Sequence, residues 1–366
     1  GGRSKSEVLG KMSKKDKEEE KKIIDTRKLV KWGSSETLIM SLPRPWVKKF
    51  QLTKDSEVSI IENQDGSLLV NPLSLMDERP KFETTVEFDA NDVEDKDLIE
   101  LEITTRYLDG SDSIFIEAKV SKDLEKFPAK FISKVQEVVQ SLLGLEITSL
   151  LSRTIKIQDI MSIHETNIDV LVRIISDTTI DFFQNLIDLV KSEGDIEASM
   201  ESIAISKKQV RKYYLRILRE LRKGLLIPTS LSKMGLTAQD TVDLAFFITD
   251  VNETSEKLEF ILHNLTAPHV ESKSDLIIDE FIEFMKIVND IFKNAVDAFL
   301  FRKKKSAIET IKTVPSLEAK KRDMENRMDE FTESEKYIHF QIILDILSKI
   351  LDHSYSIALT ALRRII

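Results

Sequence analysis

The second half of the chain carries a duplicated helical pattern, and this pattern constrains the fold more than any other feature. From residue 165 onward, apolar residues recur at helical spacing in two main stripes. Residues 180–188 align with residues 289–297 at an offset of 109, and residues 243–250 align with residues 345–352 at an offset of 102. This duplication predicts two copies of one helical bundle of about 100 residues, spanning 164–268 and 272–366. The stripes are formed by Leu171, Ile175, Thr178, Phe182 and Leu189 and by Phe281, Phe284, Met285, Val288, Phe292, Ala295 and Phe299.

Each copy is long enough for three helices. The apolar periodicity predicts helices at 166–191, 196–225 and 238–264, and again at 274–303, 305–330 and 334–365. Three helices of this length with short connections favour a left-handed bundle.

An α/β module precedes the helices, at residues 80–160. Segments 82–89 and 113–120 alternate apolar and polar residues, helical patterns cover 97–108 and 128–143, and two further strands are expected at 145–148 and 153–157. The order is βαβαββ. The module has no glycine-rich phosphate loop and no cluster of catalytic groups, so it is interpreted as a spacer or dimerisation module. The five histidines are scattered and no nucleophile motif is present, so we expect no enzyme.

The N-terminal part predicts a small β cassette at residues 26–73. Two short strands at 27–31 and 37–42 are followed by a helix at 46–50, with Pro45 in its first turn, and by a hairpin of segments 57–61 and 67–70 that turns at 63–66. Six basic residues lie between positions 27 and 49 against one acid, Glu36. They are the candidate DNA-binding residues: Arg27, Lys28, Lys31, Arg44, Lys48 and Lys49.

The cassette differs in charge from the rest of the chain. Residues 1–72 hold 15 basic and 11 acidic residues, which is +4, so the total of −9 leaves −13 for the remainder. A cationic patch on an acidic chain indicates a polyanionic partner. The alternative is a plain β-hairpin subdomain with a solvated basic rim. Residues 1–25 read as a disordered tail or expression tag, with a solvated helix or a DNA-grasping arm as alternatives.

Residues in the cassette resemble a known family. Arg27-Lys28, Ser41-Leu42-Pro43, Trp46-Val47-Lys48-Lys49 and the run at 52–58 are similar to the AbrB/MazE/SpoVT family of swapped-hairpin DNA-binding domains, in its archaeal form. That resemblance implies a homodimer that binds double-stranded DNA, since a cassette of about 45 residues is too small to bury a core alone.

The two bundles resemble a second family. Tandem three-helix bundles with an Asp inside each third helix, together with segments 145–147, 155–159 and 218–225, resemble the PhoU family of phosphate-uptake regulators. The combination of these bundles with an N-terminal AbrB-like domain resembles that of archaeal PhoU proteins. The resemblance implies that phosphate or a component of phosphate transport is the signal or partner.

The PhoU resemblance also implies metal sites, and this chain departs from them. Members of that family commonly bind iron or zinc through an acidic run on the second helix and an Asp-His pair on the third. The third-helix element is present as Asp250 and as Asp352-His353, and Glu318 is a candidate from the second helix. The acidic run of the first copy is replaced by Lys207, Lys208 and Arg211, so no firm cofactor is expected. A single divalent metal in the second bundle is the remaining candidate, and Asp250 is expected to pair with the basic helix instead.

The basic helix itself carries eight cations between Lys207 and Lys223, with Val210, Tyr214, Ile217 and Leu221 on one face. This pattern predicts that its charges lie mostly on the solvated side, with binding of phosphate or of a partner's acidic surface as alternatives.

The expected fold class is therefore multidomain α+β, with a swapped-hairpin β cassette, a small α/β module and two tandem three-helix bundles. The absence of cysteine and of an 18-residue apolar run predicts a cytoplasmic protein without a membrane span. Three functions are open: a phosphate-responsive transcription regulator, a signalling adaptor that acts on a phosphate transporter or kinase without binding DNA, and a metal-dependent or storage role.

Overall fold

The computed structural model describes residues 26–33, 36–62, 66–73, 81–119, 124–161, 167–191, 196–265, 276–329 and 335–365. Contacts divide the chain into two compact units, Gly1–Pro80 and Lys81–Ile366. The expected tail at residues 1–25 and the hairpin turn residues Asn63, Gln64 and Asp65 lie outside the described residues.

Unit 1 has the predicted strand and helix order. Strands β1 (Val30–Lys31) and β2 (Leu38–Ile39) pair antiparallel, helix α1 (Arg44–Lys49) follows, and β3 (Val58–Glu62) pairs with β4 (Leu68–Pro72) in the expected hairpin. Gly33 and Gly66 have φ values of 63° and 78°. These are left-handed conformations that glycine adopts without steric cost, as each turn requires.

The α/β module also follows the predicted order. Its elements are β5 (Glu83–Phe88), a short 3₁₀ turn at Asp92–Glu94, α3 (Lys96–Leu108), β6 (Ser113–Ala118), α4 (Ala129–Ser141), β7 (Leu145–Leu150) and β8 (Thr154–Asp159). The sheet order is β5-β6-β8-β7, with β5 and β6 parallel and the other two pairs antiparallel. The apolar face of the sheet and the inner faces of α3 and α4 bury one core that contains Phe88, Tyr107, Phe131 and Ile157.

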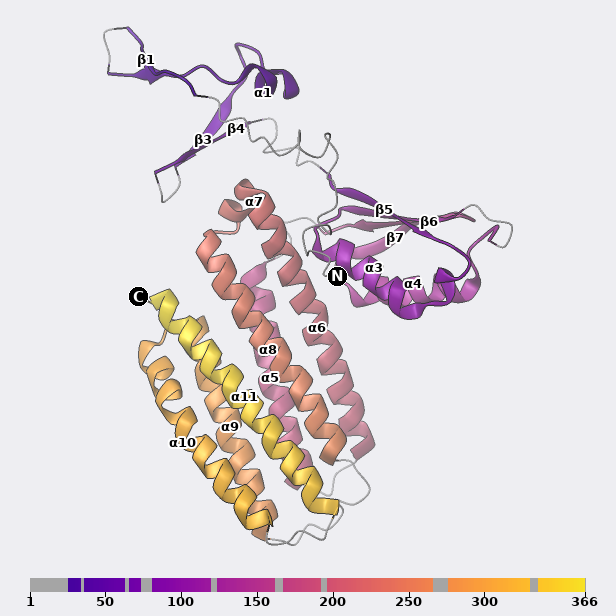
Figure 1. Cartoon of the computed structure of the whole chain (residues 1–366), viewed down its shortest axis with the longest axis vertical. Coiled ribbons are helices and arrows are strands. Elements are labelled where there is room, and N and C mark those ends of the chain that lie inside the picture. The colour runs from indigo at the N-terminus through magenta and orange to yellow at the C-terminus, as the bar shows by residue number, and fades with distance from the viewer. Residues whose placement is uncertain are drawn as a thin grey trace, which may run out of the picture. The chain divides into compact units, whose positions relative to one another are not determined.

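Helices fill the rest of unit 2, close to their predicted bounds (Figure 1). They are α5 (Ile168–Lys191), α6 (Ile196–Leu226), α7 (Pro228–Lys233), α8 (Ala238–Leu265), α9 (Leu276–Leu300), α10 (Lys304–Asp329) and α11 (Glu335–Ile365). The short α7 was not predicted. Across the described ranges, every helix is too short or too polar to cross a membrane.

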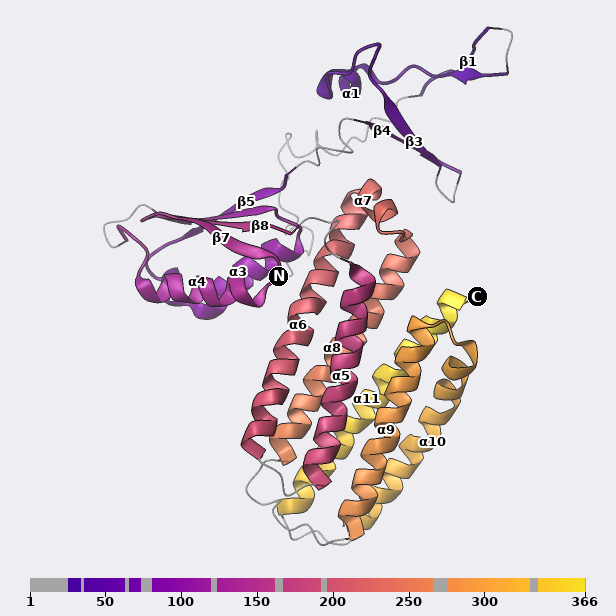
Figure 2. The same ribbon diagram turned by 180° about the vertical axis from the view of Figure 1, so that it is seen from behind.

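The two three-helix bundles share one hydrophobic core. Helices α5, α6 and α8 form the first bundle and α9, α10 and α11 the second, and they join where α8 packs on α11 and α5 packs on α9. Figure 1 shows α8 beside α11, and Figure 2, from behind, shows α5 beside α9. The rings of Phe247 and Phe299 stack across this boundary with centroids 3.9 Å apart. The fold is thus multidomain α+β, as the sequence predicts.

Burial tests the register of the duplication. Buried Ile175, Phe182, Phe183 and Leu186 of α5 correspond, at the predicted offset of 109, to buried residues of α9 (Phe284, Ile291, Phe292 and Ala295). The predicted offset of 102 for the third helices is wrong by one. Buried Leu244, Phe247, Ile248 and Val251 of α8 correspond to buried Leu347, Ile350, Leu351 and Ser354 of α11, an offset of 103. Matching similar residue types misplaced the register, because it ignored which residues face the core.

Candidate nucleic-acid interface

Helix α1 holds the centre of the basic cassette. Pro43 precedes it with φ −59° and ψ 126°, and Pro45 lies in its first turn, where no backbone N–H is needed. Gln51 ends the helical segment with φ 51°, and the N–H of Leu52 donates to the carbonyl of Val47 at 3.0 Å. The ring of Trp46 meets Phe50 edge to face at 5.6 Å between centroids. These contacts fix a single helical turn and a half with a defined outer face.

The basic side chains of the cassette point into solvent. Lys28, Lys31, Arg44, Lys48 and Lys49 are exposed. Within the described part of the chain, none of the five forms an ion pair with a carboxylate. Lys48 and Lys49 lie in the last turn of α1, where cations are stabilised by the helix dipole. Arg27, the sixth candidate, is half-buried. Five of the six predicted residues therefore present positive charge that is not paired with an acid among the described residues.

The cassette also exposes apolar side chains that a folded domain normally buries. Among its described residues only Pro72 is buried, while Trp32 is 65% exposed and Ile60 is 62% exposed. An apolar surface of this size on so small a unit marks an interaction site. The described residues of a single unit 1 therefore do not form a hydrophobic core. Among the described residues of the unit, the other exposed large apolar side chains are Leu29, Val30, Leu38, Ile39, Met40, Leu68 and Leu73.

The second basic segment, helix α6, behaves differently from the prediction. The charges between Lys207 and Lys223 were expected to lie mostly in solvent, but Arg216, Arg219 and Lys223 are at most 1% exposed. They enter a junction between α6 and the α/β module. Their spacing of three and four residues places them on one helical stripe, next to Leu215, which is buried in the core of the module.

An acid at the end of β8 is the centre of this junction. Arg216 Nη1 lies 2.9 Å and 3.0 Å from the two carboxylate oxygens of Asp159, and Arg219 donates to Asp159 Oδ2 through Nη2 at 2.9 Å and Nε at 3.2 Å. Lys223 Nζ lies 2.5 Å from Asp112 Oδ1, and Glu220 pairs with Arg216 at 3.0 Å. Desolvated charges persist only when they are paired and hydrogen-bonded, and this junction supplies both.

The same helix caps the C-terminal ends of α3 and α4. Arg219 donates to the carbonyl of Tyr107, and Arg222 Nε donates to the carbonyl of Leu108 at 3.1 Å. At the end of α4, Lys212 Nζ donates to the carbonyl of Gln140 at 3.0 Å and Arg216 donates to that of Leu143 at 3.1 Å. The last carbonyls of a helix have no partner within the helix, so cations placed there satisfy them and complement the dipole. The cations of α6 thereby attach the α/β module to the first bundle.

Two groups in the junction have shifted pKa values. Burial raises the pKa of the Tyr107 hydroxyl far above its usual range, although the neighbouring Arg216 and Arg219 oppose the shift. Burial disfavours the charged form of Arg216, but Glu220 and Asp159 raise its pKa above the usual value. Tyr107 therefore stays neutral and donates its O–H to the carbonyl of Leu143 at 2.8 Å, while Arg216 stays charged.

The four candidate metal ligands do not converge on one site, although two of them form a pair. His353 Nδ1 lies 2.9 Å from Asp250 Oδ1, which joins the two bundles across α8 and α11. Glu318 accepts a hydrogen bond from the Ser348 hydroxyl at 2.8 Å, whereas Asp352 is exposed. In the described ranges no three His, Asp or Glu side chains form a group suited to a metal ion. Asp250 was expected to pair with the basic helix, and this is wrong, because the antiparallel packing of α8 on α11 brings His353 to it.

One of the cations that replace the acidic run, Lys207, has acidic partners of its own. Lys207 pairs with Glu256 at 3.0 Å and with Glu259, both on α8. Partial burial disfavours the charged form of Lys207, but these carboxylates raise its pKa. Lys208 and Arg211 point into solvent. At this place in the first bundle, one side-chain cation therefore holds two carboxylates together.

The family comparison concerns the cassette. Residues 29–76 match the family model described as "Antidote-toxin recognition MazE, bacterial antitoxin". No curated protein and no solved structure matches the chain. The match supports the AbrB/MazE-like DNA-binding domain expected at the N-terminus. Domains of this type are typically dimeric and bind DNA, which agrees with the exposed cations and exposed apolar side chains of unit 1.

Proposed function

We propose that this protein is a phosphate-responsive transcription regulator of the PhoU type that binds double-stranded DNA through a dimer of its cassette. The observation that carries the proposal is that one small unit presents both exposed cations, without an ion pair among the described residues, and unburied apolar strands. The cations suit the DNA backbone, since each contact with a phosphate releases a condensed counterion. The apolar strands suit a second copy of the cassette, whose pairing supplies the missing core.

The regulatory part of the proposal rests on the bundles. Their resemblance to PhoU proteins and their duplicated register support a sensing role linked to phosphate uptake. A ligand regulates DNA binding only when it prefers one arrangement of the protein over another. A coupling of about 1–3 kcal/mol changes affinity roughly 5- to 150-fold.

A signalling adaptor is the second candidate. Exposed apolar residues on the outer face of α8 favour it, because Val242, Phe246 and Phe260 are each about half exposed and suit contact with another protein. In that case the cassette serves only to form the dimer. Phosphate transporters or kinases are the partners implied by the PhoU resemblance.

A binding experiment separates the two candidates. Genomic DNA fragments are first selected by binding to the full-length protein. Each selected fragment is then titrated with the protein, with and without inorganic phosphate and a small-molecule extract of the cell. The regulator is expected to enrich discrete promoter fragments, with an affinity that changes at least fivefold with the effector. If the protein binds no fragment above background, the result favours the adaptor. If it binds DNA with the same affinity in every condition, the bundles have no regulatory role in DNA binding.

A further inference from the structure

Positive charge gathers at one end of the paired bundles. Four consecutive cations, Arg302 to Lys305, run from the turn after α9 into the first turn of α10, and Arg302 turns the chain with φ 52°. Other cations join this end. Arg364 of α11 lies over the ring of Phe299 at 4.5 Å, and Arg173 of α5 lies over Phe301 at 5.2 Å. Cations from the starts of α5 and α10 and from the end of α11 thus meet here.

Most acids at this end are already paired. Lys303 pairs with Asp297 at 3.0 Å, and Arg363 and Arg364 lie 3.8 Å and 3.7 Å from Asp243 and Asp240. Partial burial opposes the charged form of Asp240, but Thr237, Arg364 and Arg302 lower its pKa, so the acid is ionised and its charge is offset.

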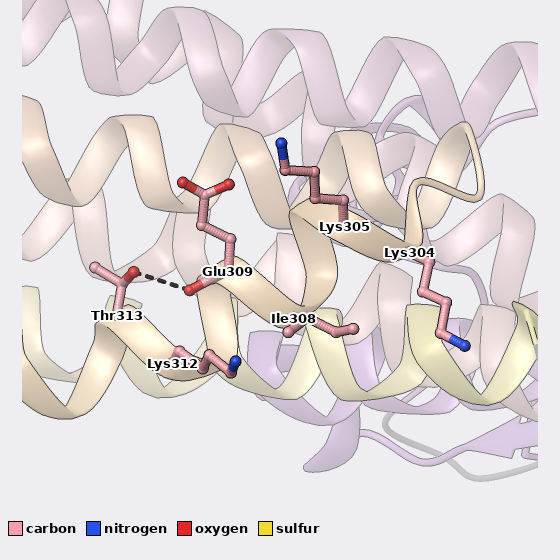
Figure 3. Close-up of a pocket in the computed structure, with 6 residues that line it drawn as sticks. All are labelled: Lys304, Lys305, Ile308, Glu309, Lys312 and Thr313. Atoms are coloured by element: carbon pink, nitrogen blue, oxygen red, sulfur yellow. Dashed lines mark hydrogen bonds between the residues drawn. The ribbon is translucent and has the colours of Figure 1, made fainter.

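The remaining lysines lie along the first turns of α10. Lys304, Lys305 and Lys312 are exposed, and none of the three has an ion pair among the described residues. With Ile308, Glu309 and Thr313 they line a shallow, open pocket of about 650 Å³, and all six residues belong to α10. Figure 3 shows Lys304, Ile308 and Lys312 along one row, and Lys305, Glu309 and Thr313 along the next. This stretch of α10 therefore carries three lysines and one carboxylate, Glu309.

We infer that this cationic end of the bundles binds the phosphate backbone of a nucleic acid. The lysines are spread along the exposed surface of one helix and are not enclosed in a cavity, which suits an extended polymer. Its cations are flexible lysines, which act as point charges toward phosphate and make no fixed two-point contact. The neighbouring Phe301 is 48% exposed and adds a flat apolar surface. The charge from residue 73 onward is −13, so a local excess of cations here is a feature of this end and not of the whole unit. The inference is independent of DNA binding by the cassette.

The test compares two triple variants of the full-length protein that change net charge equally. One carries Lys304→Gln, Lys305→Gln and Lys312→Gln. The matched control carries Lys208→Gln, Arg211→Gln and Lys293→Gln, at exposed positions without an ion pair among the described residues. Binding of duplex DNA is measured by fluorescence anisotropy between 50 and 200 mM salt. We expect the first variant to make the slope of log affinity against log salt shallower by about 0.9 for each lost contact, and the control to retain the parent slope.

Three results would overturn the inference. Equal slopes for the first variant and the parent would show that these lysines make no backbone contact. An equally shallower salt slope in both triple variants would show that the effect arises from the overall charge of the protein. If polyglutamate displaces DNA as effectively as inorganic polyphosphate does, the partner of these lysines is an acidic protein surface. A third variant with Lys28→Gln, Lys48→Gln and Lys49→Gln separates this inference from the function of the cassette, since each surface loses its own contacts.

Discussion

The cassette and helix α6 are both basic in sequence, but the structure uses their charges in opposite ways. In the cassette, Lys48 and Lys49 are exposed to solvent, and the strands of the same unit expose apolar side chains. In α6, Arg216 and Arg219 are fully buried against Asp159. Exposed cations remain available to a partner, whereas those of the junction already bind the α/β module. Charge density alone therefore does not identify a binding surface, and the position of the neutralising acids does.

The largest expected effect comes from removing the acid of the junction. Asp159→Ala leaves two buried guanidinium groups without their carboxylate, and breaking a buried pair in this way costs about 3–5 kcal/mol of folding free energy. Urea unfolding followed by circular dichroism measures the loss. The control is Asp345→Ala, whose side chain is 71% exposed and pairs with Lys321. We expect the control to lose less than about 1 kcal/mol. Equal losses in the two variants would show that the junction does not hold the module.

A glycine near Asp159 sharpens the comparison. Gly144 has φ 90°, and a Cβ atom there would lie 2.6 Å from Arg216 Nη1 and 2.7 Å from Asp159 Oδ1. Gly235 has φ 68°, and a Cβ atom there would have no other atom within 4 Å. Both Gly→Ala changes carry a left-handed backbone cost of about 1–2 kcal/mol, and only the first also displaces the ion pair. Thermal unfolding should show the greater loss for Gly144→Ala, and equal losses would mean that the junction adapts without cost.

An exposed ion pair between α6 and the end of α3 gives the smallest effect. Arg222 Nη2 lies 2.7 Å from Asp109 Oδ1, with both side chains more than half exposed. Because solvent screens such a pair, Arg222→Ala should cost no more than about 1 kcal/mol in the urea experiment. A loss as large as that of Asp159→Ala would contradict the distinction between buried and exposed cations on α6.

Periodicity predicted the fold well because it reflects local rules. The six long helices and the βαβαββ module follow from apolar spacing within each segment, and the cassette elements follow from its turns and prolines. The junction could not be predicted this way, since Asp159 lies 57 residues before Arg216 in the sequence. A usable signal was the helical spacing of the basic residues 212, 216, 219 and 223 beside Leu215. The partner of Asp250 was missed for the same reason, because His353 comes from the other bundle.

The dependence of DNA binding on salt tests the central claim most directly. The full-length protein is compared with the variant Lys28→Gln, Lys48→Gln, Lys49→Gln on one duplex between 50 and 200 mM salt. The account predicts weaker binding and a slope shallower by about 0.9 for each lysine that contacts a phosphate. A folded variant that keeps the parent affinity and the parent slope would contradict the assignment of the cassette as the DNA-binding surface.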